Sequence, residues 1–92
     1  MNNVFEALAH PTRRSILEML KSGSKSAGEI ADAFDVSKPT MSGHFAKLKE
    51  AGLIQADQKG TTIFYSINMT VLEEVLMDFM TRMGPKNGET QP

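Results

Sequence analysis

The sequence contains no cysteine. Without thiols the chain can form no disulfide, no thiolate metal site, no thioether link to haem and no thiol nucleophile. Oxidation of its methionines is the redox chemistry that remains open to it. The absence of cysteine is also compatible with a reducing compartment.

Long hydrophobic runs are missing as well. No stretch approaches the ~20 apolar residues that a membrane-spanning helix needs, so we expect no membrane insertion. The opening, MNNVFEALAHPTRR, carries charge before any useful apolar run, which argues against a signal peptide. These features predict a soluble, cytoplasmic protein. Its 92 residues are enough for one domain with a modest core, which pairing with a second copy would help to stabilise.

Catalytic patterns are absent too. The sequence has no nucleophile and base at a usable spacing, no phosphate-binding loop and no acid pair with metal-ligand partners. We therefore expect neither an enzyme nor a bound cofactor.

The charge is nearly balanced in total but unevenly distributed. A net charge of −1 does not indicate nucleic-acid binding. However, residues 38–49 contain three lysines and no acid, whereas residues 69–83 contain three acids and one arginine. The middle of the chain is therefore locally basic, although each single charge is most simply an ordinary solvated one.

Apolar spacing and capping residues predict three helices in the first part of the chain. Residues 2–9 form a short one that ends at His10, because a residue before proline is pushed out of the helical region. Pro11 suits the first turn of a second helix over 11–21. Ser26 begins the third, because Glu29 three residues later completes a capping box.

The fourth helix is predicted from Lys38 to Ala51. Ser37 is placed to cap its start, Pro39 falls in the first turn, and Gly52 suits a helix end. Its buried stripe, at helical spacing, comprises Met41, Phe45 and Leu48.

Two strands and a last helix follow. Residues 53–58 and 61–67 read as strands of a hairpin that turns at Lys59-Gly60. Residues 69–83 carry a wide apolar stripe and end at Gly84. We expect residues 1–84 to form one DNA-binding and dimerisation domain, and residues 85–92 to be a disordered tail.

This order of elements predicts a mainly α fold with a β-hairpin wing, a winged helix-turn-helix. The residues of the fourth helix that lie outside its buried stripe and are expected to point outward are Lys38, Pro39, Thr40, Ser42, Gly43, His44 and Lys47. The wing adds Lys59, Thr61 and Thr62. Small, polar and basic side chains suit base edges and phosphates, so we predict that these residues contact DNA.

Gly43 has two interpretations. Either the backbone approaches DNA so closely that no side chain fits, or the position has given up a contact. Two interpretations also apply to His44, a phosphate or base contact or a partly packed structural residue. His10 is interpreted as a helix-boundary residue.

Three segments resemble the ArsR family of bacterial repressors. SKPTMSGHFAKLKEAGLI is similar to that family's recognition helix, S-x-P-x-x-S-x-H-L-x-x-L-x-x-A-G-L, with Phe45 replacing a leucine. ALAHPTRRSILEML resembles its opening, A-L-x-x-P-T-R-R-x-I-L-x-x-L, and KGTTIFYSIN resembles its wing, K-G-x-x-x-x-Y-x-L. The short form, with NNVF before these segments and NMTVLEEVL after the wing, is similar to the SdpR-type autorepressors of that family.

The resemblance implies a homodimer on a palindromic operator of double-stranded DNA, with the first and last helices forming the dimer interface. On this sequence that interface comprises Val4, Phe5, Leu8, Leu72, Val75, Leu76, Phe79, Met80 and Met83. The alternative is that both helices are plain core elements.

Metal sensing, which many members of the family perform, is not expected here. One kind of sensor uses cysteines, and another uses histidine with acids on the last helix, which here has acids but no histidine. Glu73, Glu74 and Asp78 are better explained as a solvated face. The alternative function is a winged helix that docks a protein instead of DNA. Release by a small-molecule inducer, by a protein partner or by no signal remains open.

Overall fold

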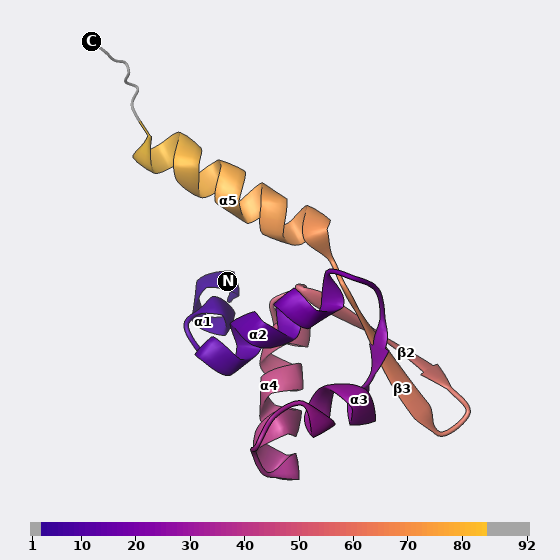
Figure 1. The fold of residues 1–92 in the computed structure, drawn as a ribbon. Coiled ribbons are helices and arrows are strands. Elements are labelled where there is room, and N and C mark those ends of the chain that lie inside the picture. The colour runs from indigo at the N-terminus through magenta and orange to yellow at the C-terminus, as the bar shows by residue number, and fades with distance from the viewer. Residues whose placement is uncertain (1–2, 85–92) are drawn as a thin grey trace.

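The computed structural model describes residues 3–84. The elements follow in the order α1 (Val4–Leu8), α2 (Pro11–Leu20), β1 (Lys25–Ser26), α3 (Ala27–Asp32), α4 (Lys38–Glu50), β2 (Ile54–Lys59), β3 (Thr62–Ile67) and α5 (Met69–Met83). The predicted winged helix-turn-helix is confirmed (Figure 1). The predicted tail at residues 85–92 lies outside the described residues.

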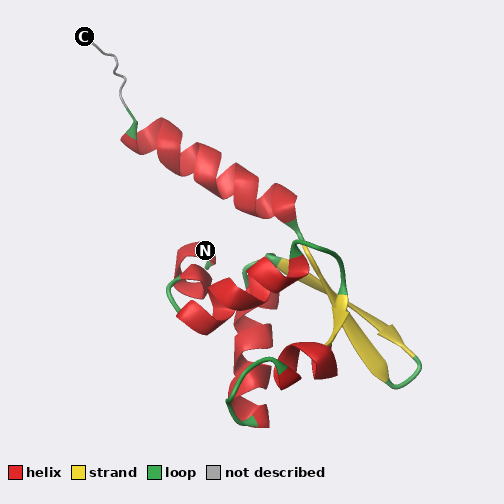
Figure 2. Cartoon of the chain, in the orientation of Figure 1, coloured by secondary structure: helices red, strands yellow, loops and turns green. Residues whose placement is uncertain are grey.

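The predicted order of elements missed β1. These two residues pair antiparallel with β3, Lys25 opposite Tyr65 and Ser26 opposite Phe64, so the sheet has three strands in the order β1-β3-β2 (Figure 2). A two-residue strand is too short to show a period of two in the sequence. Its existence depends on a partner almost 40 residues along the chain, as the paired residue numbers show.

Local capping signals set the helix starts as predicted. The Ser26 hydroxyl accepts from the Glu29 N–H at 3.0 Å, and the Glu29 carboxylate accepts from the Ser26 N–H at 2.8 Å, which completes the capping box. At α2 the His10 side chain accepts from the Thr12 N–H at 3.1 Å, so the boundary role of His10 is confirmed. Gly52, with φ +77°, ends α4 in the left-handed region that glycine tolerates best.

The hydrophobic core lies where α2, α3 and α4 meet the base of the sheet. Met41, Phe45 and Leu48 are all buried, which confirms the predicted stripe of α4. Phe45 stacks on Tyr65 of β3 with ring centroids 4.4 Å apart, so the second helix of the motif is fixed to the wing. Burial raises the pKa of the Tyr65 hydroxyl.

Helix α5 leaves this body and extends away from it, on the side opposite the start of α4 (Figure 1). Its first turns pack Val71, Leu72 and Val75 against the edge of the core. None of its fifteen residues, all of which the structure describes, is buried. No helix within residues 3–84 is long and apolar enough to cross a membrane.

The predicted place of Val4 in the dimer interface, beside Phe5, is wrong. Val4 is 1% exposed and lies in the core of its own chain, whereas Phe5 is 50% exposed and points to the other side. The core side of α1 is Val4 with Ala7, at i and i+3, and Leu8 packs partly against the same core. Val4 is therefore not available to a second copy.

Candidate nucleic-acid interface

The start of α4 presents its polar residues to solvent. The Ser37 hydroxyl accepts from the Thr40 N–H at 3.3 Å and donates to the Thr40 hydroxyl at 2.9 Å. This cap fixes the first turn, in which Lys38 and Pro39 are exposed. It leaves the Thr40 hydroxyl hydrogen available to a further acceptor.

The next turn continues the same surface. Ser42 and Gly43 are exposed, while Met41 on the opposite side is buried. No described side chain, and no described backbone beyond the local helix, lies within 4 Å of the position that a Cβ on Gly43 would occupy. The glycine is therefore not required by packing within this chain.

The predicted outward position of His44 is wrong. Its side chain is 6% exposed, the Nδ1 atom lies 3.2 Å from the Arg13 Nη1 atom, and the ring centroid is 4.5 Å from that of His10. Burial lowers the pKa of His44, and the neighbouring His10 and Arg13 lower it further. A buried histidine of this kind is a structural residue, which was the second of its two interpretations.

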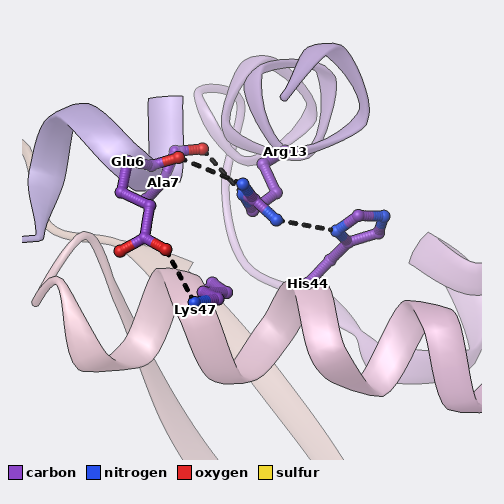
Figure 3. A network of polar contacts seen from close by, with 5 residues as sticks. All are labelled: Glu6, Ala7, Arg13, His44 and Lys47. Atoms are coloured by element: carbon purple, nitrogen blue, oxygen red, sulfur yellow. Dashed lines mark hydrogen bonds and ion pairs between the residues drawn. The ribbon is translucent and has the colours of Figure 1, made fainter. Parts of the chain in front are cut away.

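Arg13 is the residue that sequence reasoning missed. Its Nε donates to the Ala7 carbonyl at 2.8 Å and its Nη2 donates to the Glu6 carbonyl at 3.0 Å, both at the C-terminal end of α1 (Figure 3). Carbonyls in the last turn of a helix lack their usual i+4 partner. The Glu6 carbonyl accepts from the Ala9 N–H at 3.2 Å, and the guanidinium supplies a further donor to it and to the Ala7 carbonyl. Arg14 donates to the Leu8 carbonyl at 2.7 Å in the same way. The sequence feature that could have pointed to Arg13 and Arg14 is the Arg-Arg pair that begins two residues after Pro11.

Lys47 is engaged within the chain. Its Nζ lies 2.8 Å from the Glu6 Oε2 atom, and this hydrogen bond with its charge lowers the pKa of the Glu6 carboxyl. Both side chains are about half exposed, at 43% and 56%, so the pair remains open to solvent. Lys47 therefore differs from Lys38, for which no ion-pair partner lies among the described residues.

The wing carries the second group of predicted contacts. Lys59, Thr61 and Thr62 are all exposed at the tip of the hairpin. Its two-residue turn has Gly60 first, with φ +63°, as type II′ turns prefer. Lys59 has Asp57 3.8 Å away, an exposed pair of the kind that contributes little.

The predicted dimer residues fall into two groups. Leu8, Leu72 and Val75 are half-buried against the core of their own chain. Phe5, Leu76, Phe79, Met80 and Met83 are exposed, as is Met77, which was not predicted. The Phe5 and Phe79 rings lie 5.4 Å apart, so α1 and α5 share one apolar surface.

Within residues 3–84, no three histidine or acidic side chains lie where they could hold a metal ion together. Glu73, Glu74 and Asp78 are exposed on α5, and Asp78 is paired with Arg82 at 3.0 Å. They fit a solvated face.

Comparison with known proteins extends this picture. Residues 8–55 match the model of a helix-turn-helix domain family. Over 74 residues the chain is 51% identical to the transcriptional repressor SdpR of Bacillus subtilis, covering 80% of this chain and 82% of that protein.

Solved structures are similar over nearly the same span. The crystal structure of an ArsR family transcriptional regulator superposes with a TM-score of 0.74 at 30% identity, covering 86% of this chain and 84% of the other. The solution structure of a homodimeric winged helix-turn-helix DNA-binding domain from Mycobacterium bovis gives 0.69 at 33% identity, covering 83% and 76%.

Proposed function

Because this chain belongs to the ArsR family of winged helix-turn-helix regulators, we propose that it is a transcriptional repressor that binds a palindromic operator as a homodimer. The observation that carries the proposal is the outward surface of α4. Its first two turns expose Lys38, Thr40 and Ser42, with no acid among residues 38–49. In this motif the N-terminal part of the second helix enters the major groove.

Two kinds of contact divide the surface. The hydroxyls of Thr40 and Ser42 can donate to or accept from base edges, so they are proposed to read sequence. Lys38 on α4 and Lys59 on the wing are proposed to neutralise phosphates. Pro39, Gly43, Thr61 and Thr62 complete the surface that faces the backbone and the groove.

Dimerisation is supported by the state of α5. A helix of about 15 residues is marginal in water unless an apolar face is packed, and α5 exposes large side chains along most of its length, with Met80 and Met83 67% and 69% exposed. A second copy would cover them together with Phe5. Two-fold symmetry then places two α4 helices on two half-sites, whose centres we expect to lie about 10 base pairs or a multiple apart.

We further propose that the protein acts in the cytoplasm, has no enzymatic activity and binds its operator without a transition metal. The last point can be tested directly. Operator affinity should be the same in chelator and in a modest excess of zinc. A clear loss on adding zinc, with the protein still soluble, would contradict it.

Selection of bound sequences from a random DNA pool tests the main proposal. We expect enrichment of one inverted repeat. Failure to enrich any sequence, or enrichment of a single asymmetric site, would contradict a dimer on a palindrome.

A salt titration on the selected site then separates DNA binding from protein docking. Phosphate contacts make log affinity fall linearly with log salt, by about 0.9 per phosphate neutralised. Lys38→Ala should lower this slope by about one unit. Lys21→Ala removes the same charge beside Met69 and Leu72 at the base of α5, and should leave the slope unchanged. Equal slopes for the two variants would place the DNA elsewhere.

A further inference from the structure

Two polar connections link α1 to α4. One is direct, from Glu6 to Lys47. The other runs through α2, because the Arg13 guanidinium binds two α1 carbonyls and the His44 ring at the same time (Figure 3). The two α4 residues are three positions apart, so they lie on one face of that helix.

The chemistry of the second connection requires a particular state of His44. Arginine has donors and no acceptor, so the Nδ1 atom of His44 must accept, which leaves a neutral ring with its hydrogen on Nε2. Protonation would place a second cation against Arg13 and remove the acceptor. The charged or titratable groups around His44 are Arg13 from α2, His10 at the start of α2, and the Glu6–Lys47 pair between α1 and α4.

Helix α1 contacts both α5 and α4. On one side α1 contacts α5 through Phe5 and Phe79. On the other it is tied to α4 through Arg13 and through Glu6. α1 therefore lies between the apolar surface proposed for dimerisation and the helix proposed to enter DNA.

We propose that Arg13 is a positioning residue for DNA binding, which fixes the orientation of α4 relative to α1 by donating to a neutral His44. In a dimer this orientation determines whether both α4 helices meet their half-sites together. The inference rests on the proposed function, since it concerns the orientation of the α4 surface that is proposed to bind DNA.

A matched pair of variants tests it. Arg13→Ala and Arg14→Ala each remove one positive charge. Arg13→Ala removes hydrogen bonds to two α1 carbonyls and Arg14→Ala removes one, but Arg14 makes no hydrogen bond to α4 among those of the described residues. Arg13→Ala should weaken binding to the selected operator by about tenfold or more, as expected for losing hydrogen bonds from a charged group. Arg14→Ala should bind the operator within a few-fold of the wild type, because it leaves the contact between Arg13 and His44 on α4 intact. Binding to random DNA should change equally in both.

A second variant keeps the test independent of folding losses. His44→Asn retains an acceptor near the Nδ1 position and cannot be protonated. It should bind the operator within a few-fold of the wild type at about pH 7.5. Over the pH range in which nitrogen-15 spectra show His44 gaining its proton, wild-type affinity should decrease relative to that of His44→Asn. Identical pH profiles would overturn the proposal.

Nitrogen-15 spectra of the histidines provide a reading without DNA. His44 should carry its hydrogen on Nε2, and it should titrate at higher pH in Arg13→Ala than in the wild type, because a neighbouring cation is gone. A hydrogen on Nδ1 would overturn the inference. If the wild type selects no operator, the proposed function fails. If it selects one but the Arg13→Ala and Arg14→Ala variants bind it equally, the positioning role fails.

Discussion

Replacing Gly43 by alanine should stabilise the free protein. Gly43 is the sixth of the thirteen residues of α4, where a glycine costs about 0.5–1 kcal/mol relative to alanine through backbone entropy. The new methyl group meets no described side chain within 4 Å, so no steric cost offsets this gain. The free energy of unfolding should rise by the same roughly 0.5–1 kcal/mol.

The expected change in melting temperature follows from the size of the chain. One kcal/mol shifts the melting temperature of a domain this small by about 4–8 °C, so Gly43→Ala should melt roughly 2–8 °C higher. Melts must be compared at equal protein concentration, because dimerisation makes the melting temperature depend on it. Ala46→Gly, at an exposed position one turn further along α4, is the matched control and should lower the melting temperature by a similar amount.

Operator titrations on the same variant separate the two interpretations of this glycine. If the position has given up a contact, Gly43→Ala should bind the operator within a few-fold of the wild type. A variant that melts higher but binds about a hundredfold more weakly, a loss of nearly 3 kcal/mol, would show that the backbone approaches DNA too closely for a side chain. A variant that melts lower would refute the helix-entropy argument itself.

Four further predictions concern other parts of the molecule. Leu76→Glu should place a charge in the proposed dimer interface at a cost of several kcal/mol, and a variant still dimeric at micromolar concentration in sedimentation would contradict that interface. Phe45→Ala should lower the free energy of unfolding by about 3–5 kcal/mol in urea melts, since it empties a buried site; a loss below 1 kcal/mol would mean the site is not packed as described. Burial lowers the pKa of His44 below its ordinary 6.5, so the unfolded chain binds the proton more readily than the folded one. The contribution of this residue to stability is therefore complete above pH 6.5 and decreases as the pH falls below it. Urea melts on both sides of that pH should show a drop in the free energy of unfolding that His44→Asn lacks. Lys38→Ala should weaken binding to all DNA sequences, whereas Ser42→Ala should cost ~1 kcal/mol or more on the operator alone; equal effects on operator and random DNA would mean that Ser42 does not read bases.

The sequence alone determined the features that depend on neighbours within one or two turns. Ser26 with Glu29, and Ser37 with Pro39, act as helix starts because a cap and the N–H that it satisfies are separated by three residues or fewer. The buried stripe of α4 follows from its period, since residues at helical spacing must share one face. The order of these elements was then sufficient to indicate the winged helix-turn-helix.

The tertiary structure decided everything that joins distant segments. His44 and Arg13 are 31 positions apart, and Lys47 and Glu6 are 41 apart. Helical periodicity grouped His44 with the outward residues of α4. The boundary between a buried and an exposed helix face depends on what packs against the helix, and here the packing of α1 and α2 buries His44. The strand β1 exists for the same reason, since its hydrogen bonds come from β3. Contacts of this kind arise when chain segments pack together, and no local pattern encodes which segments will meet.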